Sequence, residues 1–249
     1  MDAEAVDQTP RSSEERFRRF SDRDAALVRW RFGQGYVARL AERRYRSMFH
    51  GGSRILDVGC GVGEAAIQAG GADYVGIDLS ESLVREGRGR PGRRLAVADV
   101  AHLPFADGTF DRVCCMGVLH HLGRNAIRPA LREMARVLET GGEVAIVEPN
   151  PWSPYQRVFA WVRPPERGIL NTSPRALRRI VTSIPALAIA RFEYDHTMPL
   201  AALATFLLRR WRWPTGPRMT RLLEWLHRRA VRLRPGPLRT HTFWRLRKR

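Results

Sequence analysis

The stretch Ile-Leu-Asp-Val-Gly-Cys-Gly-Val-Gly, residues 55–63, decides the fold of this 249-residue chain. Its first four residues form a short apolar run typical of a buried strand, and three glycines at alternate positions follow at once. Glycine lets a backbone turn sharply and approach a ligand closely, with the N–H groups of a following helix pointing at that ligand. The sequence therefore predicts a strand, a ligand-binding turn and a helix in succession.

Strand patterns alternate with helix patterns on the C-terminal side of this turn. Further strands are expected at residues 74–78, 95–99, 111–116, 143–147, 187–194 and 240–246. Helices are expected at residues 64–69, 80–87 and 125–138, the last ended by Gly141-Gly142, and another begins at Ser173-Pro174. Because the first five strands read as continuous apolar runs, we expect a parallel sheet with helices on both faces.

We expect one domain over residues 14–249, preceded by a disordered stretch at 1–13. Its parts are N-terminal helices at 14–50, broken near Gly33-Gln34-Gly35, a ligand-binding core at 51–150 and a basic helical cap at 199–237. The cap is an insertion between the last two strands. Its apolar positions repeat with helical spacing between Met219 and Leu233, with arginines on the remaining face and tryptophans nearby.

Charge is concentrated near the C-terminus. The chain has 43 basic and 25 acidic residues, a net charge of +18, and residues 151–249 alone carry +17. Residues 51–150 carry −2. A basic amphipathic helix with tryptophan suits an anionic membrane surface, whereas a lid helix with a solvated arginine face and a nucleic-acid footprint are the alternatives.

Composition limits the other function classes. The three cysteines have neither zinc-ligand spacing nor a disulfide pattern, so we expect a cytoplasmic protein without a metal centre. Residues 1–15 lack an apolar signal core, and no apolar run approaches the roughly 20 residues that span a bilayer.

Acidic side chains end two of the expected strands. The glycine spacing G-x-G-x-G differs from the G-x-G-x-x-G of dinucleotide enzymes, and no phosphate-binding lysine follows. Asp78 ends the second strand, where a carboxylate accepts ribose hydroxyls in Rossmann-like sites, and Asp99 ends the third, where an adenine amino group would lie. The alternative for both is a simple strand-end turn residue.

Six segments in order resemble the class I S-adenosylmethionine-dependent methyltransferases, in particular the group with ubiquinone/menaquinone-type and lipid-modifying enzymes. They are ILDVGCGVG (55–63), VGIDLS (75–80), ADVAHLPF (98–105), FDRV (110–113), VLHHL (118–122) and RVLETGGE (136–143). The resemblance implies a Rossmann-like, seven-stranded, mostly parallel sheet with strand 7 antiparallel. It also implies S-adenosylmethionine as the cofactor.

The resemblance also implies which residues at the ends of the expected strands contact the cofactor. Asp57 would organise the turn and reach the methionine amino group, unless it only braces backbone N–H groups. Asp78 would hold the ribose, Asp99 and Val100 would frame the adenine, and Met116 and Gly117 would flank the methionine. The full expected cofactor set is Asp57, Gly59, Cys60, Gly61, Gly63, Asp78, Leu79, Asp99, Val100, Met116 and Gly117.

Candidates for a general base follow the fourth and fifth strands. His120 and His121 come after the fourth strand, and Glu148 and Asn150 end the fifth. Packing and turn capping are the alternatives for the histidines. We expect methyl transfer to a small-molecule or lipid-like acceptor, with peripheral membrane attachment. RNA methylation through the basic segment and a non-catalytic S-adenosylmethionine-binding regulator remain alternatives.

Overall fold

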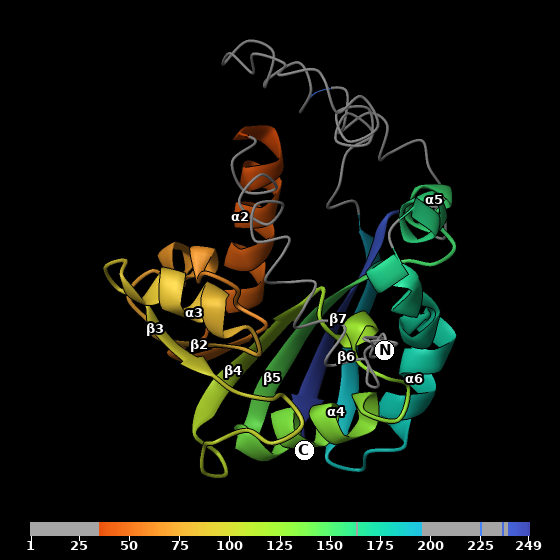
Figure 1. The fold of residues 1–249 in the computed structure, drawn as a ribbon. Helices are drawn as coiled ribbons and strands as arrows, with labels where there is room; N and C mark the ends of the chain where they lie inside the picture. Colours follow the sequence, from red (N-terminus) through yellow and green to blue (C-terminus); the bar gives the residue numbers. More distant parts are fainter. Residues whose placement is uncertain (1–34, 163, 196–224, 226–235, 237–238) are drawn as a thin grey trace, which may run out of the picture.

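The computed structural model describes residues 35–162, 164–195, 225, 236 and 239–249. Figure 1 shows one seven-stranded sheet with helices packed against it. The expected stretch at 1–13, the first N-terminal helix and most of the 199–237 cap lie outside the described residues. The second N-terminal helix is present as α2 (Gly35–Phe49).

The sheet has the order β3-β2-β1-β4-β5-β7-β6. Strand β7 runs antiparallel to both of its neighbours, and the other strand pairs are parallel, so the expected sheet is confirmed. The strands are β1 (Arg54–Val58), β2 (Asp73–Asp78), β3 (Arg94–Val97), β4 (Phe110–Met116), β5 (Leu138–Pro149), β6 (Leu187–Asp195) and β7 (His241–Lys248).

Helices cover both faces of this sheet. One face packs against α2, the 3-10 helix η1 (Glu64–Ala69) and α3 (Glu81–Arg88). The other packs against the 3-10 turn η2 (Leu119–His121), α4 (Ile127–Val137) and α6 (Pro174–Thr182). The alternation of side chains along the strands divides the core accordingly. Ile55 and Phe243 point to the first face, and Leu56 and Trp244 to the second.

Serine side chains cap two of the helices. The Ser80 hydroxyl accepts the Leu83 N–H at the start of α3, and the Ser173 hydroxyl accepts the Ala176 N–H at the start of α6. In both cases the side chain satisfies a donor that the first helical turn leaves unpaired.

Two boundaries differ from the expectation. The pair Gly141-Gly142 does not end α4, because α4 stops at Val137 and the glycines lie within the long strand β5. A Cβ at Gly142 would lie 3.0 Å from the Asp111 carbonyl oxygen, so glycine lets β5 approach the chain at Asp111 closely. Strand β3 ends at Val97, which places Asp99 in the following loop.

The carboxyl ends of β1, β2, β4 and β5 lie along one edge of the sheet, and α5 (Pro154–Val162) stands at the same edge (Figure 1). The 3-10 segment η3 (Pro164–Thr172) continues from α5 and packs against η2. We call this edge the cofactor edge. Among the described residues, no helix is both long enough and apolar enough to cross a bilayer.

Candidate functional site

The glycine-rich turn has a backbone that only glycine adopts easily. Gly59, Gly61 and Gly63 have φ values of 72°, 56° and 71°, a region that residues with a Cβ rarely enter. A Cβ at Gly59 would also lie 2.2 Å from Val118 Cγ2. All three glycines therefore serve the shape of the turn, and Gly59 also serves its close packing against Val118 at the start of η2.

The turn is tied to the end of β2. The N–H groups of Gly59 and Cys60 both donate to the Ile77 carbonyl oxygen, at 2.8 and 2.9 Å. The Gly61 N–H donates to Asp78 Oδ2 at 2.8 Å. These bonds place Gly59, Cys60, Gly61 and Asp78 next to one another. The Cys60 thiol is buried, and burial raises its pKa well above the usual value, so it is an inert packing group.

Asp57 lies beneath the turn and is 1% exposed. Its Oδ2 accepts the Tyr74 hydroxyl at 2.7 Å. Burial raises the pKa of Asp57 from 3.8 to about 7, the Tyr74 hydrogen bond opposes the rise, and the Asp78 charge adds to it. The position agrees with an organising role, and the carboxylate is poised to ionise when a cation binds nearby.

Asp78 ends β2 with backbone donors on both oxygens. Oδ2 takes the Gly61 N–H, and Oδ1 takes the Ser80 N–H at 2.9 Å. Burial raises the pKa of Asp78, and the backbone donors oppose the shift. Each oxygen keeps a further lone pair, so the carboxylate can still accept the hydroxyls of a ribose. Leu79, next to it, is half-buried.

Asp99 and Val100 follow β3. Asp99 Oδ1 accepts the Ala101 N–H at 2.9 Å and thus braces a turn, while its side chain remains 31% exposed. Val100 is buried in the core beneath. Asp99 therefore forms a turn and remains partly exposed. This position is compatible with either prediction from the sequence, a turn residue or a contact to adenine.

Met116 and Gly117 end β4 at the cofactor edge. Both are half-buried, and the Gly117 N–H donates to the Val147 carbonyl oxygen at 2.8 Å. Gly117 has a φ of 71°, so the chain turns abruptly out of the sheet at this residue. The ends of β1 and β4 lie side by side here, with Val58 paired to Cys115, where the resemblance places the methionine part of the cofactor.

Glu148 braces the start of η2. Its side chain is fully buried, and Oε1 accepts the N–H groups of Val118 and Leu119 at 3.0 and 2.8 Å. Oε2 accepts the His120 N–H at 3.2 Å and lies 2.7 Å from His120 Nδ1. Four donors surround this carboxylate, so its evident task is to hold η2 and orient His120.

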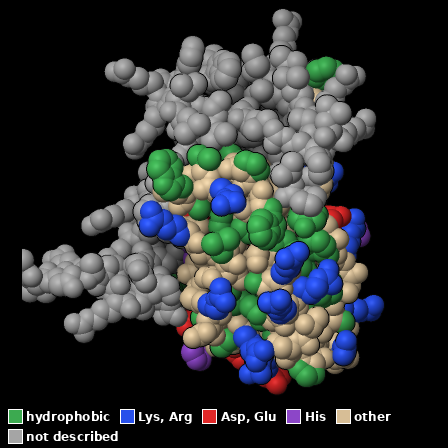
Figure 2. All heavy atoms as spheres, turned by 90° about the vertical axis from the view of Figure 1, so that its right-hand side faces the viewer, with side chains coloured by type: hydrophobic (Ala, Val, Ile, Leu, Met, Phe, Trp, Pro, Cys, Tyr) green, Lys and Arg blue, Asp and Glu red, His purple; other side chains and the backbone are tan. Residues whose placement is uncertain are grey.

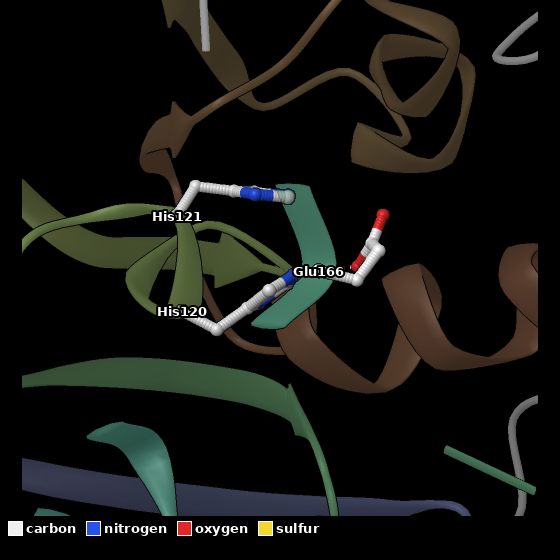
Figure 3. A group of neighbouring side chains, drawn as sticks. All are labelled: His120, His121 and Glu166. Carbon is white, nitrogen blue, oxygen red and sulfur yellow. Dashed lines mark hydrogen bonds and ion pairs between the residues drawn. The ribbon is translucent and has the colours of Figure 1, made fainter. Parts of the chain in front are cut away.

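His120 lies between two carboxylates. Its Nε2 lies 3.1 Å from Glu166 Oε2, on the side opposite Glu148. Burial lowers the pKa of His120, but the two glutamates outweigh it and raise the pKa to about 9. The His121 ring lies against it, with centroids 3.9 Å apart, and is half-buried. Figure 3 shows both rings extending from η2 toward the segment that carries Glu166.

Asn150 lies just beyond β5 and is fully buried. Its Nδ2 donates to the Arg239 carbonyl oxygen at 2.7 Å, and its Oδ1 accepts the Trp152 N–H at 3.2 Å. The side chain therefore ties the start of the α5 connection to the segment before β7. Both polar groups of Asn150 are used in these structural hydrogen bonds, so Asn150 is a weaker candidate for a general base than His120 or His121.

Two residues of the site were not predicted from the sequence. Tyr74 lies two residues before Gly76, which pairs with Asp57 across β1 and β2, and its hydroxyl donates to Asp57 Oδ2. The strand register could have indicated it, since Tyr74 and Gly76 share a face. Glu166 comes from the proline-rich connection, and only its long-range packing brings it to His120.

Comparison with known proteins identifies the family. The methyltransferase domain model matches residues 56–146, which include the glycine turn and most of β5. A demethylmenaquinone methyltransferase of Corynebacterium urealyticum is 33% identical over 163 residues, which cover 62% of this chain and 69% of that protein. A demethylmenaquinone methyltransferase of Beutenbergia cavernae is 36% identical over 142 residues, 54% of either chain.

Other similar proteins act on other molecules or share the fold alone. The human "Probable tRNA methyltransferase 9B" is 41% identical over 96 residues, 38% of this chain and 21% of that protein. The solved structure of the cyclase SpnF superposes with a TM-score of 0.64 at 19% identity, over 95% of this chain and 96% of that one. The chain spans about half or less of the length of several curated relatives that it matches.

The residues present fit the cofactor that this family uses. The positive-φ glycine turn offers a surface that a Cβ would fill, and the Asp78 carboxylate stands beside it with lone pairs to spare. The chain therefore belongs to the class I methyltransferase family, whose cofactor is S-adenosylmethionine.

Proposed function

We propose that this chain transfers a methyl group from S-adenosylmethionine to a small, lipid-like acceptor that it meets at an anionic membrane surface. The observation that carries the membrane part is a mixed apolar and basic surface on α5, η3 and the start of α6. We call it the Trp–Arg face and define it by Trp152, Val158, Trp161, Leu170, Arg157, Arg167 and Arg175. All seven side chains are exposed.

Large apolar side chains are concentrated on this face. Trp161 is 78% exposed, Leu170 63%, Trp152 48% and Val158 46%. On α5 the buried side chains, such as Tyr155 and Ala160, lie opposite an outward row that ends at Trp161. A helix that served only as a lid would turn polar groups outward, so the exposed row suits contact with an apolar medium.

The arginines of the face add charge complementarity to an anionic surface. Among the described residues, Arg157, Arg167 and Arg175 have no carboxylate within ion-pair distance. Figure 2, which views the side carrying α5 and α6, shows arginine and hydrophobic side chains intermingled, with acidic side chains only near the margins. Tryptophan with arginine is typical of proteins that lie in the headgroup region of a membrane.

The face also adjoins the site of chemistry. Its segments α5 and η3 follow directly from β5, whose end lies at the cofactor edge, and η3 carries Glu166 to His120. An acceptor that leaves the membrane at this face would therefore have a short path to the cofactor. The sulfonium methyl is already activated, so alignment of a nucleophile supplies much of the catalysis.

Membrane binding is tested by flotation with vesicles of phosphatidylcholine containing 30% phosphatidylglycerol, compared with pure phosphatidylcholine. Each arginine near an anionic surface contributes about 1 kcal/mol, so changing Arg157, Arg167 and Arg175 to glutamine should weaken binding by roughly 100-fold at low salt. The matched control changes three exposed arginines elsewhere, Arg54, Arg85 and Arg94, and should retain most of the binding.

The apolar part is tested separately. Trp161→Ser should weaken binding at high salt, where charge is screened, whereas Ile67→Ser, at a residue 71% exposed on η1, should not. Wild-type protein that ignores anionic vesicles would refute the membrane proposal. Methyl transfer is tested with radiolabelled S-adenosylmethionine on lipid extract, total RNA and small metabolites in parallel.

RNA methylation is the second candidate, and the similarity to a tRNA-methyltransferase relative and the charge of +18 favour it. Incorporation into RNA, with binding that falls steeply with salt, would move this candidate ahead. Absence of incorporation into all three pools would favour a non-methylating use of the fold.

A further inference from the structure

We propose that His120, His121 and Glu166 form a binding site for one divalent transition-metal ion, with zinc as the reference. The three side chains come from two segments, η2 and η3. Each offers one ligand atom, and these atoms lie within 4.8 Å of one another. Among the described residues this is the one group of three or more such side chains that meets in this way.

The geometry presents nitrogen and oxygen to a common point. His120 Nε2 and Glu166 Oε2 are 3.1 Å apart, close to the roughly 3.3 Å that separates two ligands of a tetrahedral zinc ion. His121 lies alongside His120, and Figure 3 shows the two imidazoles reaching in the same direction. A ring nitrogen of the half-buried His121 lies within 4.8 Å of both of these atoms.

Glu148 supplies the second, independent observation. A carboxylate can only accept, so the contact of 2.7 Å requires His120 to donate Nδ1–H to Glu148. This fixes the ring and directs Nε2 at Glu166, to which it donates its own proton in the metal-free protein. A histidine oriented by a carboxylate through its other nitrogen is the usual support of a metal-binding imidazole.

Charge at the cluster favours a dication. Glu148 and Glu166 place two carboxylates within 3.1 Å of one imidazole. A divalent ion would displace the Nε2 proton to solvent, replace the direct contact between His120 and Glu166, and balance the charges of the two carboxylates. Two imidazoles with one carboxylate suit zinc, iron, manganese, cobalt or nickel, whereas magnesium and calcium prefer oxygen ligands alone.

The metal site lies close to the expected position of the cofactor. His120 Cε1 lies 3.9 Å from where a Cβ at Gly117 would stand, next to the expected methionine part of the cofactor. Three protein ligands leave one coordination position open. An acceptor with an oxygen donor could bind there with that oxygen near the transferred methyl group. The metal site itself does not depend on the proposed acceptor.

The test measures metal content on untagged protein. The protein is stripped with EDTA, dialysed against buffered zinc, and analysed for metal and by thermal unfolding; one equivalent and a raised melting temperature are expected. Glu166→Gln keeps the shape but removes the charged ligand, and we expect zinc affinity to fall at least tenfold. His121→Asn should do the same.

Two controls separate this site from other zinc-binding groups. His102→Asn removes an exposed histidine beside Asp99, and Glu139→Gln an exposed glutamate; neither should change zinc binding. Circular dichroism confirms that each variant folds. The proposal is overturned if the wild type holds no zinc after dialysis, or if the Glu166 and His121 variants bind as tightly as the wild type.

Discussion

Asp57→Asn is expected to change how stability depends on pH, because Asp57 is a buried acid whose pKa is raised to about 7 in the folded chain, from 3.8. Between pH 4 and 7 the folded chain therefore binds more protons at this group than the unfolded chain does. The free energy of unfolding then falls as the pH rises, with a slope approaching 1.4 kcal/mol per pH unit.

The magnitude follows from the two pKa values. Full ionisation of buried Asp57 above pH 7 costs the folded state on the order of 4 kcal/mol. Of this, about 2–3 kcal/mol accrues between pH 5 and pH 8. Asparagine retains an oxygen for the Tyr74 hydroxyl and cannot ionise, so the variant should gain this amount on the wild type across the same interval.

Urea unfolding of both proteins without cofactor, followed by tryptophan fluorescence at pH 5, 6, 7 and 8, measures the difference. Subtraction removes the effect of groups that do not interact with Asp57. Burial and the Asp57 charge raise the pKa of the nearby Cys60 and Cys114 thiols well above its usual value, so both stay protonated across this range. Asp107→Asn is the control, because it makes the same carboxylate-to-amide change at a side chain that is 78% exposed. A pH-independent difference for Asp57→Asn would refute the reasoning.

The same variant should bind S-adenosylmethionine more weakly, because the expected partner of Asp57 is the cationic amino group of the cofactor. A charge-assisted hydrogen bond contributes roughly 1.5–3 kcal/mol, so affinity at pH 8 should fall at least tenfold. The wild-type affinity should rise between pH 6 and 8 as Asp57 ionises. The affinity of the variant should lack that rise, which calorimetry can measure.

Three further predictions concern the cofactor edge. Asp78→Ala should lower the affinity for S-adenosylhomocysteine at least tenfold in a folded protein, and unchanged affinity by calorimetry would place the ribose elsewhere. Gly59→Ala should destabilise the fold by more than the roughly 1–2 kcal/mol of a left-handed alanine, because its Cβ would meet Val118 at 2.2 Å. Gly71→Ala is its control, with a φ of 92° and no atom within 4 Å of the added Cβ; equal losses in urea unfolding would exclude the contact with Val118. Tyr74→Phe should raise the pKa of Asp57 further, measurable as a steeper loss of stability above pH 7.

The sheet could be predicted from the sequence because each strand is marked by the apolar residues of its own short segment. Strands β1, β4 and β5 are covered on both faces, so each holds a continuous apolar run, at 55–56, 113–116 and 144–147, and the alternation between Ile55 and Leu56 serves two core layers at once. The sharp turn after β1 could be predicted for the same reason. The conformation of the turn depends on Gly59, Gly61 and Gly63 themselves.

The environment of each site residue could not be predicted, because it depends on distant partners. Asp57 could be placed under the turn, but its shifted pKa arises from burial and from Tyr74, across the β1–β2 register. His120 could be placed near the cofactor edge, but Glu166 reaches it from 46 positions further along the chain. The pair Gly141-Gly142 wrongly predicts a helix end, because Gly142 instead allows β5 to approach the chain at Asp111 closely.

Glu148 shows how these local and distant parts depend on one another. It holds the N–H groups of Val118 and Leu119, and Val118 packs against the glycine turn at Gly59. It also orients His120 toward Glu166. Loss of Glu148 would therefore disturb the cofactor turn and the histidine cluster together. Glu166 contacts His120 on the side away from Glu148, so a substitution of Glu166 tests metal binding while Glu148 still braces the turn.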